Sequence, residues 1–339
     1  MNTRTATDAV RGSARALALA ALLVIVSNEV LDRSGWPAAV LTGHPDSMTR
    51  YESLRAQVAA EGANDVVVIG ASMIHGGVIP SVVAEELSRQ RDGALVRVFN
   101  FGIAGHNALT FPMLVELVLA VDRPRAFVFR ISPRATDSTA AENNRWADIV
   151  LESAYAKALL DPLPPRGRIA RWLLDHAALR NRAPHLRLRL IGEGALPERA
   201  SGAMDPERGY RSREPRVLNQ RMRDHQRAIV RDWRTAPAYA DALDTAIGAA
   251  QAAGARVLLV DAPQRGALLE LMASPERNLQ GGRRTLQAAA ERTGAASAFV
   301  PPDLVSDRDF ADYTHLLPEA AAVYSHWLAG AIARELPDF

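Results

Sequence analysis

Residues 65–77 read DVVVIGASMIHGG, an apolar run that ends in a glycine-rich turn containing Ser72. Such a run is typical of a strand buried on both faces of a parallel sheet. Similar strand-like runs lie at 95–100, 125–131, 255–260 and 295–300, and helical patterns at 78–89, 108–121, 238–253, 283–293 and 318–334. Strands that alternate with helices predict an α/β fold, with a central parallel sheet covered by helices on both faces.

The alternation stops between about residues 133 and 235, a stretch rich in Arg, Pro and short helical pieces such as 168–179 and 219–233. We interpret this stretch as a large helical insertion within one α/β domain of residues 46–339. The domain begins with a polar, helical-looking linker at 46–62.

The insertion is also basic. Residues 166–234 hold 17 Arg against 8 Asp and Glu, although the whole chain has a formal net charge of only +2. This charge could face an anionic polymer or lipid headgroups, or the segment could be a solvated insertion with no partner. A nucleic-acid partner is not expected, because no binding motif or aromatic stacking pattern accompanies the arginines.

The N-terminus contains an apolar run at 16–26, preceded by Arg4, Arg11 and Arg15. We expect residues 1–45 to form a single-pass anchor in the inner (cytoplasmic) membrane, followed by a linker. The positive charges before the run favour a cytoplasmic N-terminus, which would place the α/β domain on the periplasmic side. A cleaved signal peptide and an ordinary buried or interfacial helix are the alternatives, since the run is short for a bilayer span.

Several kinds of site are excluded or not expected. The chain has no cysteine, so it can form neither a disulfide nor a cysteine-ligated zinc site, and no thiolate nucleophile. It also lacks a Gly-Lys-Ser/Thr motif, and its single lysine is Lys157, which excludes a P-loop after the first strand. No metal or organic cofactor is expected, because the eight histidines show no pairing such as His-x-x-x-His.

Polar residues that could take part in catalysis follow three of the predicted strands. Ligands of open parallel sheets bind beyond the carboxyl ends of the strands, which is where these residues fall. Ser72 lies on the turn after the first strand, and Asp312 and His315 lie in the sequence FADYTHLLP at 310–318. Histidine can take the proton of a serine hydroxyl near neutral pH, and a carboxylate can orient the imidazole. Each motif also has a plainer interpretation, a structural turn for Ser72 and a surface pair for Asp312 and His315.

The third group reads NFGIAGHN at 100–107, after the second strand. Backbone N–H groups of Gly102 or Gly105, with a side-chain amide from Asn100 or Asn107, could bind the oxyanion of an acyl-transfer reaction. The plainer interpretation is a glycine-containing connection between a strand and a helix.

Together these three groups resemble the SGNH (GDSL-like) hydrolase superfamily over roughly residues 62–131 and 236–335. The resemblance implies a flavodoxin-like three-layer sandwich with Ser72 as the nucleophile, His315 as the base and Asp312 as its orienting carboxylate. It implies Gly102 or Gly105 as an oxyanion donor. The chain departs from the family in lacking Gly-x-Asn after the third strand.

At that position the chain reads Arg130-Ile-Ser-Pro-Arg134. Arg130 or Arg134 could replace the missing asparagine as an oxyanion or substrate contact, or the site could have lost its activity. We therefore keep Arg134, together with Gly102, Gly105 and Asn107, as a candidate oxyanion or substrate-binding residue.

The anchor, the exported domain and the insertion resemble the membrane-associated SGNH-like acyltransferases of alginate O-acetylation and teichoic-acid D-alanylation. This resemblance implies transfer or hydrolysis of an acyl ester, acetyl by expectation, on an envelope polysaccharide that is anionic or neutral. The implied partners are an acylated small-molecule or carrier donor and a membrane acyltransferase. The alternatives are a catalytically silent module that binds polysaccharide or scaffolds an export complex, and a simple lipase or soluble esterase.

Overall fold

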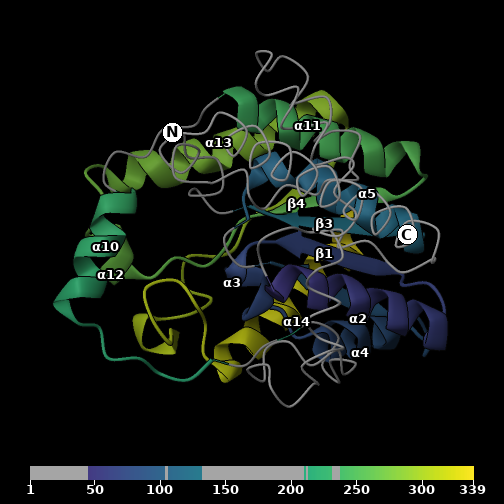
Figure 1. Ribbon diagram of the computed structural model, residues 1–339, viewed down its shortest axis with the longest axis horizontal. Helices are drawn as coiled ribbons and strands as arrows, with labels where there is room; N and C mark the ends of the chain where they lie inside the picture. Colours follow the sequence, from purple (N-terminus) through teal and green to yellow (C-terminus); the bar gives the residue numbers. More distant parts are fainter. Residues whose placement is uncertain (1–44, 104–105, 132–209, 211–212, 231–236) are drawn as a thin grey trace, which may run out of the picture. The chain divides into compact units, whose positions relative to one another are not determined.

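Five short apolar strands form the centre of the protein in the computed structural model (Figure 1). The structure describes residues 45–103, 106–131, 210, 213–230 and 237–339. All of them belong to one compact unit, His44–Asp148 with Gly202–Phe339. The other unit, Met1–Gly43 with Ile149–Ser201, lies outside the described residues, as do nearly all of the predicted anchor and most of the predicted insertion.

The strands are β1 (Val66–Gly70), β2 (Val98–Gly102), β3 (Ala126–Arg130), β4 (Arg256–Val260) and β5 (Ala296–Ala298). They pair in parallel in the order β2-β1-β3-β4-β5, with Val66 opposite both Val98 and Ala126. This order reverses direction between β1 and β3, as in flavodoxin-like folds, and such a switch point is where open α/β sheets bind ligands. The predicted α/β fold with a central parallel sheet is confirmed.

Helices cover both faces of the sheet. They are α2 (Pro45–Glu61), α3 (Ser72–His75), α4 (Pro80–Gln90), α5 (Phe111–Val121), α10 (Gln220–Val230), α11 (Pro237–Ala252), α12 (Gly266–Leu269), α13 (Pro275–Thr293) and α14 (Pro318–Glu335). Two 3-10 turns, η1 (Ala108–Thr110) and η6 (Asp307–Asp309), precede α5 and α14. Helices α4 and α14 lie together on one face, and α5, α11 and α13 lie on the other (Figure 1).

Alternate side chains of each strand pack into these two layers. Val66 and Val68 of β1 pack with Leu87 of α4 and Leu328 of α14 in one buried cluster. The opposite face of β3 carries an aromatic stack, in which the Phe129 ring centroid lies 5.8 Å from that of Phe111 on α5. Complete burial of β1, β2 and β3 explains why their sequences are mainly apolar.

The structure differs from the predicted elements mainly at their ends. Helix α13 begins at Pro275, eight residues before the predicted start at Arg283. Gly281 and Gly282, which disfavour helices, lie just before the predicted start. The helix nevertheless extends through them, because Asn278, Gly282 and Leu286 form a buried stripe along it. Leu95, predicted to begin β2, is 70% exposed and lies before the strand.

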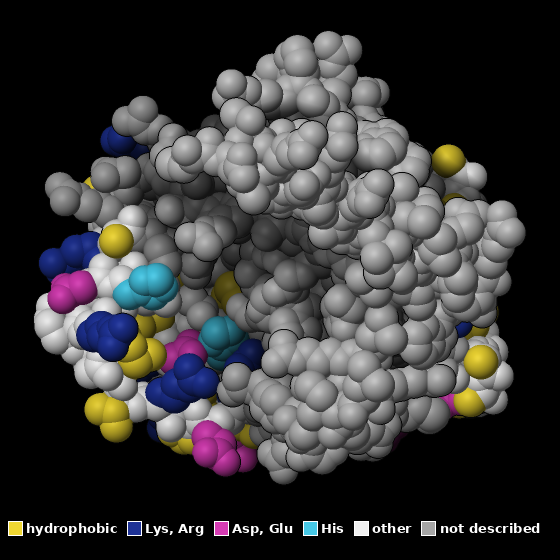
Figure 2. All heavy atoms as spheres, viewed as in Figure 1, with side chains coloured by type: hydrophobic (Ala, Val, Ile, Leu, Met, Phe, Trp, Pro, Cys, Tyr) yellow, Lys and Arg dark blue, Asp and Glu magenta, His cyan; other side chains and the backbone are white. Residues whose placement is uncertain are grey.

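Helix α10 is a described part of the Arg-rich stretch and presents basic side chains to solvent. Figure 2 shows Lys and Arg side chains gathered on the left of the molecule, over the region that Figure 1 labels α10 and α12. The exposed arginines of this region are Arg216, Arg221, Arg223 and Arg227. The other face of α10 is apolar, since Met222 packs against the cluster that contains Leu268, Leu271 and Tyr313. Within the described ranges, no helix has the length and apolar character needed to cross a bilayer.

Candidate active site

The loop between β5 and α14, residues 309–317, carries two of the predicted catalytic residues, and we call it the His315 loop. Its backbone folds back on itself. The Ala311 N–H donates to the His315 carbonyl at 2.8 Å, the Leu317 N–H donates to the Asp309 carbonyl at 2.9 Å, and Phe310 forms a bridge with Leu316. Pro318 then occupies the first turn of α14, as predicted. The loop therefore has a defined conformation although it belongs to no strand or long helix.

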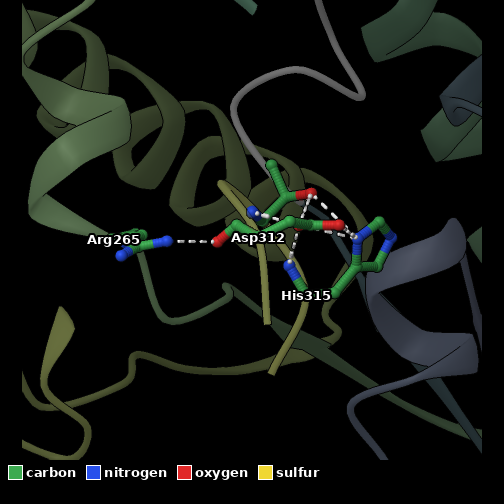
Figure 3. A network of polar contacts seen from close by, with 4 residues as sticks. Arg265, Asp312 and His315 are labelled. Carbon is green, nitrogen blue, oxygen red and sulfur yellow. Dashed lines mark hydrogen bonds and ion pairs between the residues drawn. The ribbon is translucent and has the colours of Figure 1, made fainter. Parts of the chain in front are cut away.

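Asp312 and His315 are in direct contact at the tip of this loop (Figure 3). The Nδ1 atom of His315 lies 2.8 Å from Oδ2 and 2.9 Å from Oδ1 of Asp312. The Asp312 Oδ1 atom also accepts backbone N–H bonds from Thr314 and His315, at 2.9 and 3.0 Å. Both side chains are largely buried, with 11% of Asp312 and 17% of His315 exposed. The spacing of three residues thus brings the carboxylate to the near nitrogen of the ring.

These contacts keep Asp312 ionised. Burial of the carboxyl group opposes ionisation and raises its pKa, but the hydrogen bond and charge of His315 and the two backbone N–H groups outweigh burial. The net result is a pKa well below the usual aspartate range. An ionised carboxylate at Nδ1 holds the proton of the neutral imidazole on that nitrogen, so Nε2 carries the lone pair.

The Nε2 atom of His315 is buried and has no hydrogen-bond partner among the described residues. Buried polar atoms are seldom left without a partner, and one that remains so needs an explanation. A basic nitrogen held in a fixed orientation and free to accept a proton is what a general base requires.

Ser72 begins α3, directly after the carboxyl end of β1, and its side chain is partly exposed. The turn that contains it, residues 70–77, packs against the His315 loop. Ile74 and Leu316 belong to one buried cluster, and a Cβ atom built on Gly77 would lie 3.8 Å from the Leu316 Cδ1 atom. No hydrogen bond joins the side chains of Ser72 and His315 in the part of the chain that the structure describes. The catalytic role of Ser72 remains a prediction.

The helix after Ser72 differs from expectation. Helix α3 is a single turn, and the longer helix α4 begins only at Pro80. A one-turn helix has little macrodipole, so α3 adds little dipole stabilisation of negative charge near Ser72.

The prediction that Gly102 donates to an oxyanion needs correction. The Gly102 N–H donates to Oδ1 of Asn100 at 3.0 Å, and Asn100 donates from Nδ2 to the carbonyls of Ile74 and Val78. Asn100 is completely buried, so neither of these groups is available to a ligand in this conformation. Their role is structural, because they tie the end of β2 to the turn that follows Ser72.

A side chain at position 102 would also collide with that turn. A Cβ atom built on Gly102 would lie 2.5 Å from the backbone nitrogen of His75 and 2.7 Å from Ile74 Cγ2. The glycine is therefore explained by the close approach of β2 and α3, without any catalytic role.

The other oxyanion candidates are placed differently. Asn107 is buried, and its Oδ1 atom accepts the Leu109 N–H at 3.0 Å as the cap of η1, which leaves Nδ2 as its possible donor. Gly105 and Arg134 lie outside the described residues. Arg130, considered as a replacement for the missing asparagine, is only 4% exposed and its guanidinium carbon lies 5.1 Å from the ring centroid of Tyr324. Arg130 thus packs against Tyr324 of α14 in this conformation.

A cavity of about 260 Å³ lies further along the same edge of the sheet, beyond β4 and β5. Its wall includes Asp261, whose carboxylate accepts bonds from Arg283 Nε at 2.8 Å and from the Val300 N–H at 2.6 Å. Burial raises the pKa of Asp261, although these bonds oppose the rise. Neither Ser72 nor His315 lines this cavity. Within the described residues, no group of three or more His, Asp or Glu side chains is arranged to hold a metal ion.

Two polar residues at this edge of the sheet, Asp261 and Arg265, were not among the predicted site residues. Asp261 directly follows β4, so its place at the carboxyl end of a strand was an available signal. Arg265 donates from Nη1 to the backbone carbonyl of Asp312 at 2.9 Å (Figure 3). No spacing rule connects these two residues, which lie 47 positions apart.

Comparisons with known proteins give weak similarities. No protein-family model and no curated protein matches the chain. Among solved structures, a catalytic mutant of an acetylxylan esterase from Geobacillus stearothermophilus has a TM-score of 0.40 and 13% identity, covering 80% of this chain and 92% of its own. The lipase/acylhydrolase of Enterococcus faecalis has a TM-score of 0.39 and 11% identity, covering 80% and 95%. At these values, neither similarity assigns an activity to this chain.

Proposed function

We propose that this protein is an SGNH-like serine acyl-ester transferase or esterase that acts on an envelope polysaccharide through an acyl-Ser72 intermediate. The observation that carries the proposal is the Asp312–His315 pair in a loop that packs against the Ser72 turn. The His315 Nε2 atom is buried and has no partner among the residues that the structure describes. The sequence resemblance to SGNH hydrolases supports the same three roles.

In the proposed mechanism His315 Nε2 takes the proton of the Ser72 hydroxyl as its oxygen attacks the acyl carbonyl carbon. The tetrahedral intermediate collapses, the bond to the donor alcohol breaks, and that alcohol leaves with the proton from His315. A sugar hydroxyl or a water molecule then attacks acyl-Ser72, with His315 again as the base. Throughout, Asp312 holds the imidazole in one orientation and stabilises its protonated form.

The proposed setting is the periplasmic face of the inner membrane, with residues 1–45 as the anchor. The basis is the Arg-flanked apolar run at 16–26. The acyl group would be acetyl, delivered by an acylated small molecule or carrier with the help of a membrane acyltransferase. The exposed arginines around α10 favour an anionic acceptor over a neutral one.

The direct test is hydrolysis of p-nitrophenyl acetate by the full chain. Replacing Ser72 or His315 with Ala should abolish the enzymatic rate, a loss of about 10³-fold or more. The matched controls are Ser81→Ala and His326→Ala, because both side chains are exposed on helices that are not part of the site. Adding uronic-acid or neutral oligosaccharides and following acetyl transfer by mass spectrometry would separate a transferase from an esterase.

The second candidate is a catalytically silent module that binds polysaccharide. It is favoured by the oxyanion candidates, since the Gly102 N–H is engaged by Asn100 and Arg130 is buried. Equal rates for wild type, Ser72→Ala and His315→Ala, with no transfer to any acceptor, would refute the enzyme. Retained binding of an oligosaccharide would then support the silent module.

A further inference from the structure

Arg265 joins two loops that lie at neighbouring strand ends. It follows β4 by five residues, and its Nη1 atom donates to the backbone carbonyl of Asp312 at 2.9 Å. In Figure 3 Arg265 approaches Asp312 from one side, while the carboxylate of Asp312 points to His315 on the other. The arginine therefore touches the backbone of the residue that orients the proposed base.

The same two loops are held together at a second point. The Asp307 carboxylate accepts the N–H groups of Gly266 and Ala267, at 2.5 and 3.1 Å, and lies 3.9 Å from Arg265 Nε. Asp307 itself belongs to η6, immediately before the His315 loop. Arg265 is only 16% exposed, so its contact with Asp312 is made largely out of solvent. A hydrogen bond from a charged donor in a largely buried position is stronger than one between neutral groups at the surface.

The position of the Asp312 backbone decides where its carboxylate lies. A guanidinium that fixes the carbonyl of this residue restricts rotation of the peptide plane, and with it the direction of the Cα–Cβ bond. We propose that Arg265 is a positioning residue, which holds Asp312 so that its carboxylate stays at Nδ1 of His315. It acts without touching the substrate.

The effect of Arg265 is geometric. The groups that face the Asp312 carboxylate are the His315 ring, the N–H groups of Thr314 and His315, and the Thr314 hydroxyl at 3.4 Å. Burial raises the pKa of Asp312, and the His315 ring and the two N–H groups lower it. Arg265 faces the carbonyl and not the carboxylate of Asp312. Removing the Arg265 side chain should therefore change the geometry of the Asp312–His315 pair more than the charge on Asp312.

The test compares Arg265→Met and Arg265→Lys in the full chain. Methionine keeps an unbranched stem and removes the donors, whereas lysine keeps the positive charge and N–H donors but loses the planar guanidinium. We expect Arg265→Met to lower kcat for p-nitrophenyl acetate by about 10- to 100-fold with little change in KM, and Arg265→Lys to recover part of the loss. The control is Arg292→Met, which also removes an arginine hydrogen bond, to the Asp244 carboxylate, but at an exposed site on α13.

A second measurement does not depend on turnover. The proton shared by His315 Nδ1 and Asp312 should give a downfield proton NMR signal, identified by its loss in Asp312→Asn. Arg265→Met should shift or broaden this signal, while Arg292→Met should leave it unchanged. In an Asp312→Asn background, Arg265→Met should cause no further loss of kcat, because the two changes disturb one contact.

The proposal is overturned if Arg265→Met changes neither kcat nor the NMR signal. It is equally overturned if this variant lowers only the melting temperature while kcat per folded molecule stays the same. The kinetic part rests on the proposed function, whereas the NMR part does not. A wild type without Ser72-dependent hydrolysis would refute the function, and the NMR signal would still decide whether Arg265 positions Asp312.

Discussion

The His315 loop and the turns that follow β1 and β2 lie at the same edge of the sheet but differ in how their polar groups are used. In the His315 loop, the backbone and the Asp312 carboxylate are bonded internally, and the His315 Nε2 atom has no partner within the described part of the chain. After β1 and β2, by contrast, the Gly102 N–H donates to the Asn100 side chain, and the Asn100 amide donates to the Ile74 carbonyl in the turn after Ser72. The proposed acid–base half of the site is thus assembled locally, whereas the Gly102 N–H, one of the predicted oxyanion donors, is already engaged.

The two regions correspond to two separate requirements of the proposed reaction. A serine esterase needs a base and also donors for the charge that develops on the carbonyl oxygen. In the proposed function His315 is the base, and among the described residues Asn107 is the remaining predicted candidate for the oxyanion donor. Predictions about Asn107, Gly102 and Asp312 test the two halves separately.

The largest expected effect concerns Asn107. If its Nδ2 atom stabilises the oxyanion, Asn107→Asp should lower kcat by about 10²- to 10³-fold, because aspartate keeps the Oδ1 cap to Leu109 and loses the N–H donor. Steady-state hydrolysis of p-nitrophenyl acetate measures the loss. Full activity in Asn107→Asp would restrict this residue to capping η1 and leave the oxyanion half without an identified side chain.

The next effect is on stability, at Gly102. We expect Gly102→Ala to destabilise the fold by about 1–3 kcal/mol, since the new methyl group must displace the backbone at His75. Gly330→Ala is the matched control, because its Cβ would meet nothing within 4 Å and alanine favours a helix by about 0.5–1 kcal/mol. Urea unfolding of both variants provides the comparison. Equal stability would mean that β2 and α3 do not approach as closely as described.

The smallest effect is the pH dependence of stability that Asp312 contributes. Its pKa is lower in the folded state, so its stabilising contribution is complete above the ordinary aspartate pKa of about 3.9 and declines as the pH falls below it. The stability difference between wild type and Asp312→Asn should therefore shrink between about pH 5 and pH 3. Urea unfolding across this range measures it. A difference that stays constant would show that the carboxylate is not held ionised by His315.

Local sequence patterns were sufficient to predict most helices and strands and the contact between Asp312 and His315. All five strands were predicted from apolar runs, because strands inside a parallel sheet need apolar side chains. Pro318 correctly marked the start of α14, because the fixed backbone angle of proline suits the first turn of a helix. The contact of Asp312 with His315 followed from a spacing of three residues. The start of α13 was missed, since a glycine pair masked a helix that is stabilised by packing.

The sequence by itself determined the parallel α/β sheet and the pairing of a carboxylate with an imidazole, since both depend on residues close together in the chain. Only the tertiary structure decided what surrounds that pair. The Arg265 contact with Asp312, the capture of the Gly102 N–H by Asn100, and the burial of Arg130 against Tyr324 depend on how separate loops and layers meet. The physical reason is that hydrogen bonds and burial are set by distance in space, and no local periodicity records which distant donor reaches which acceptor.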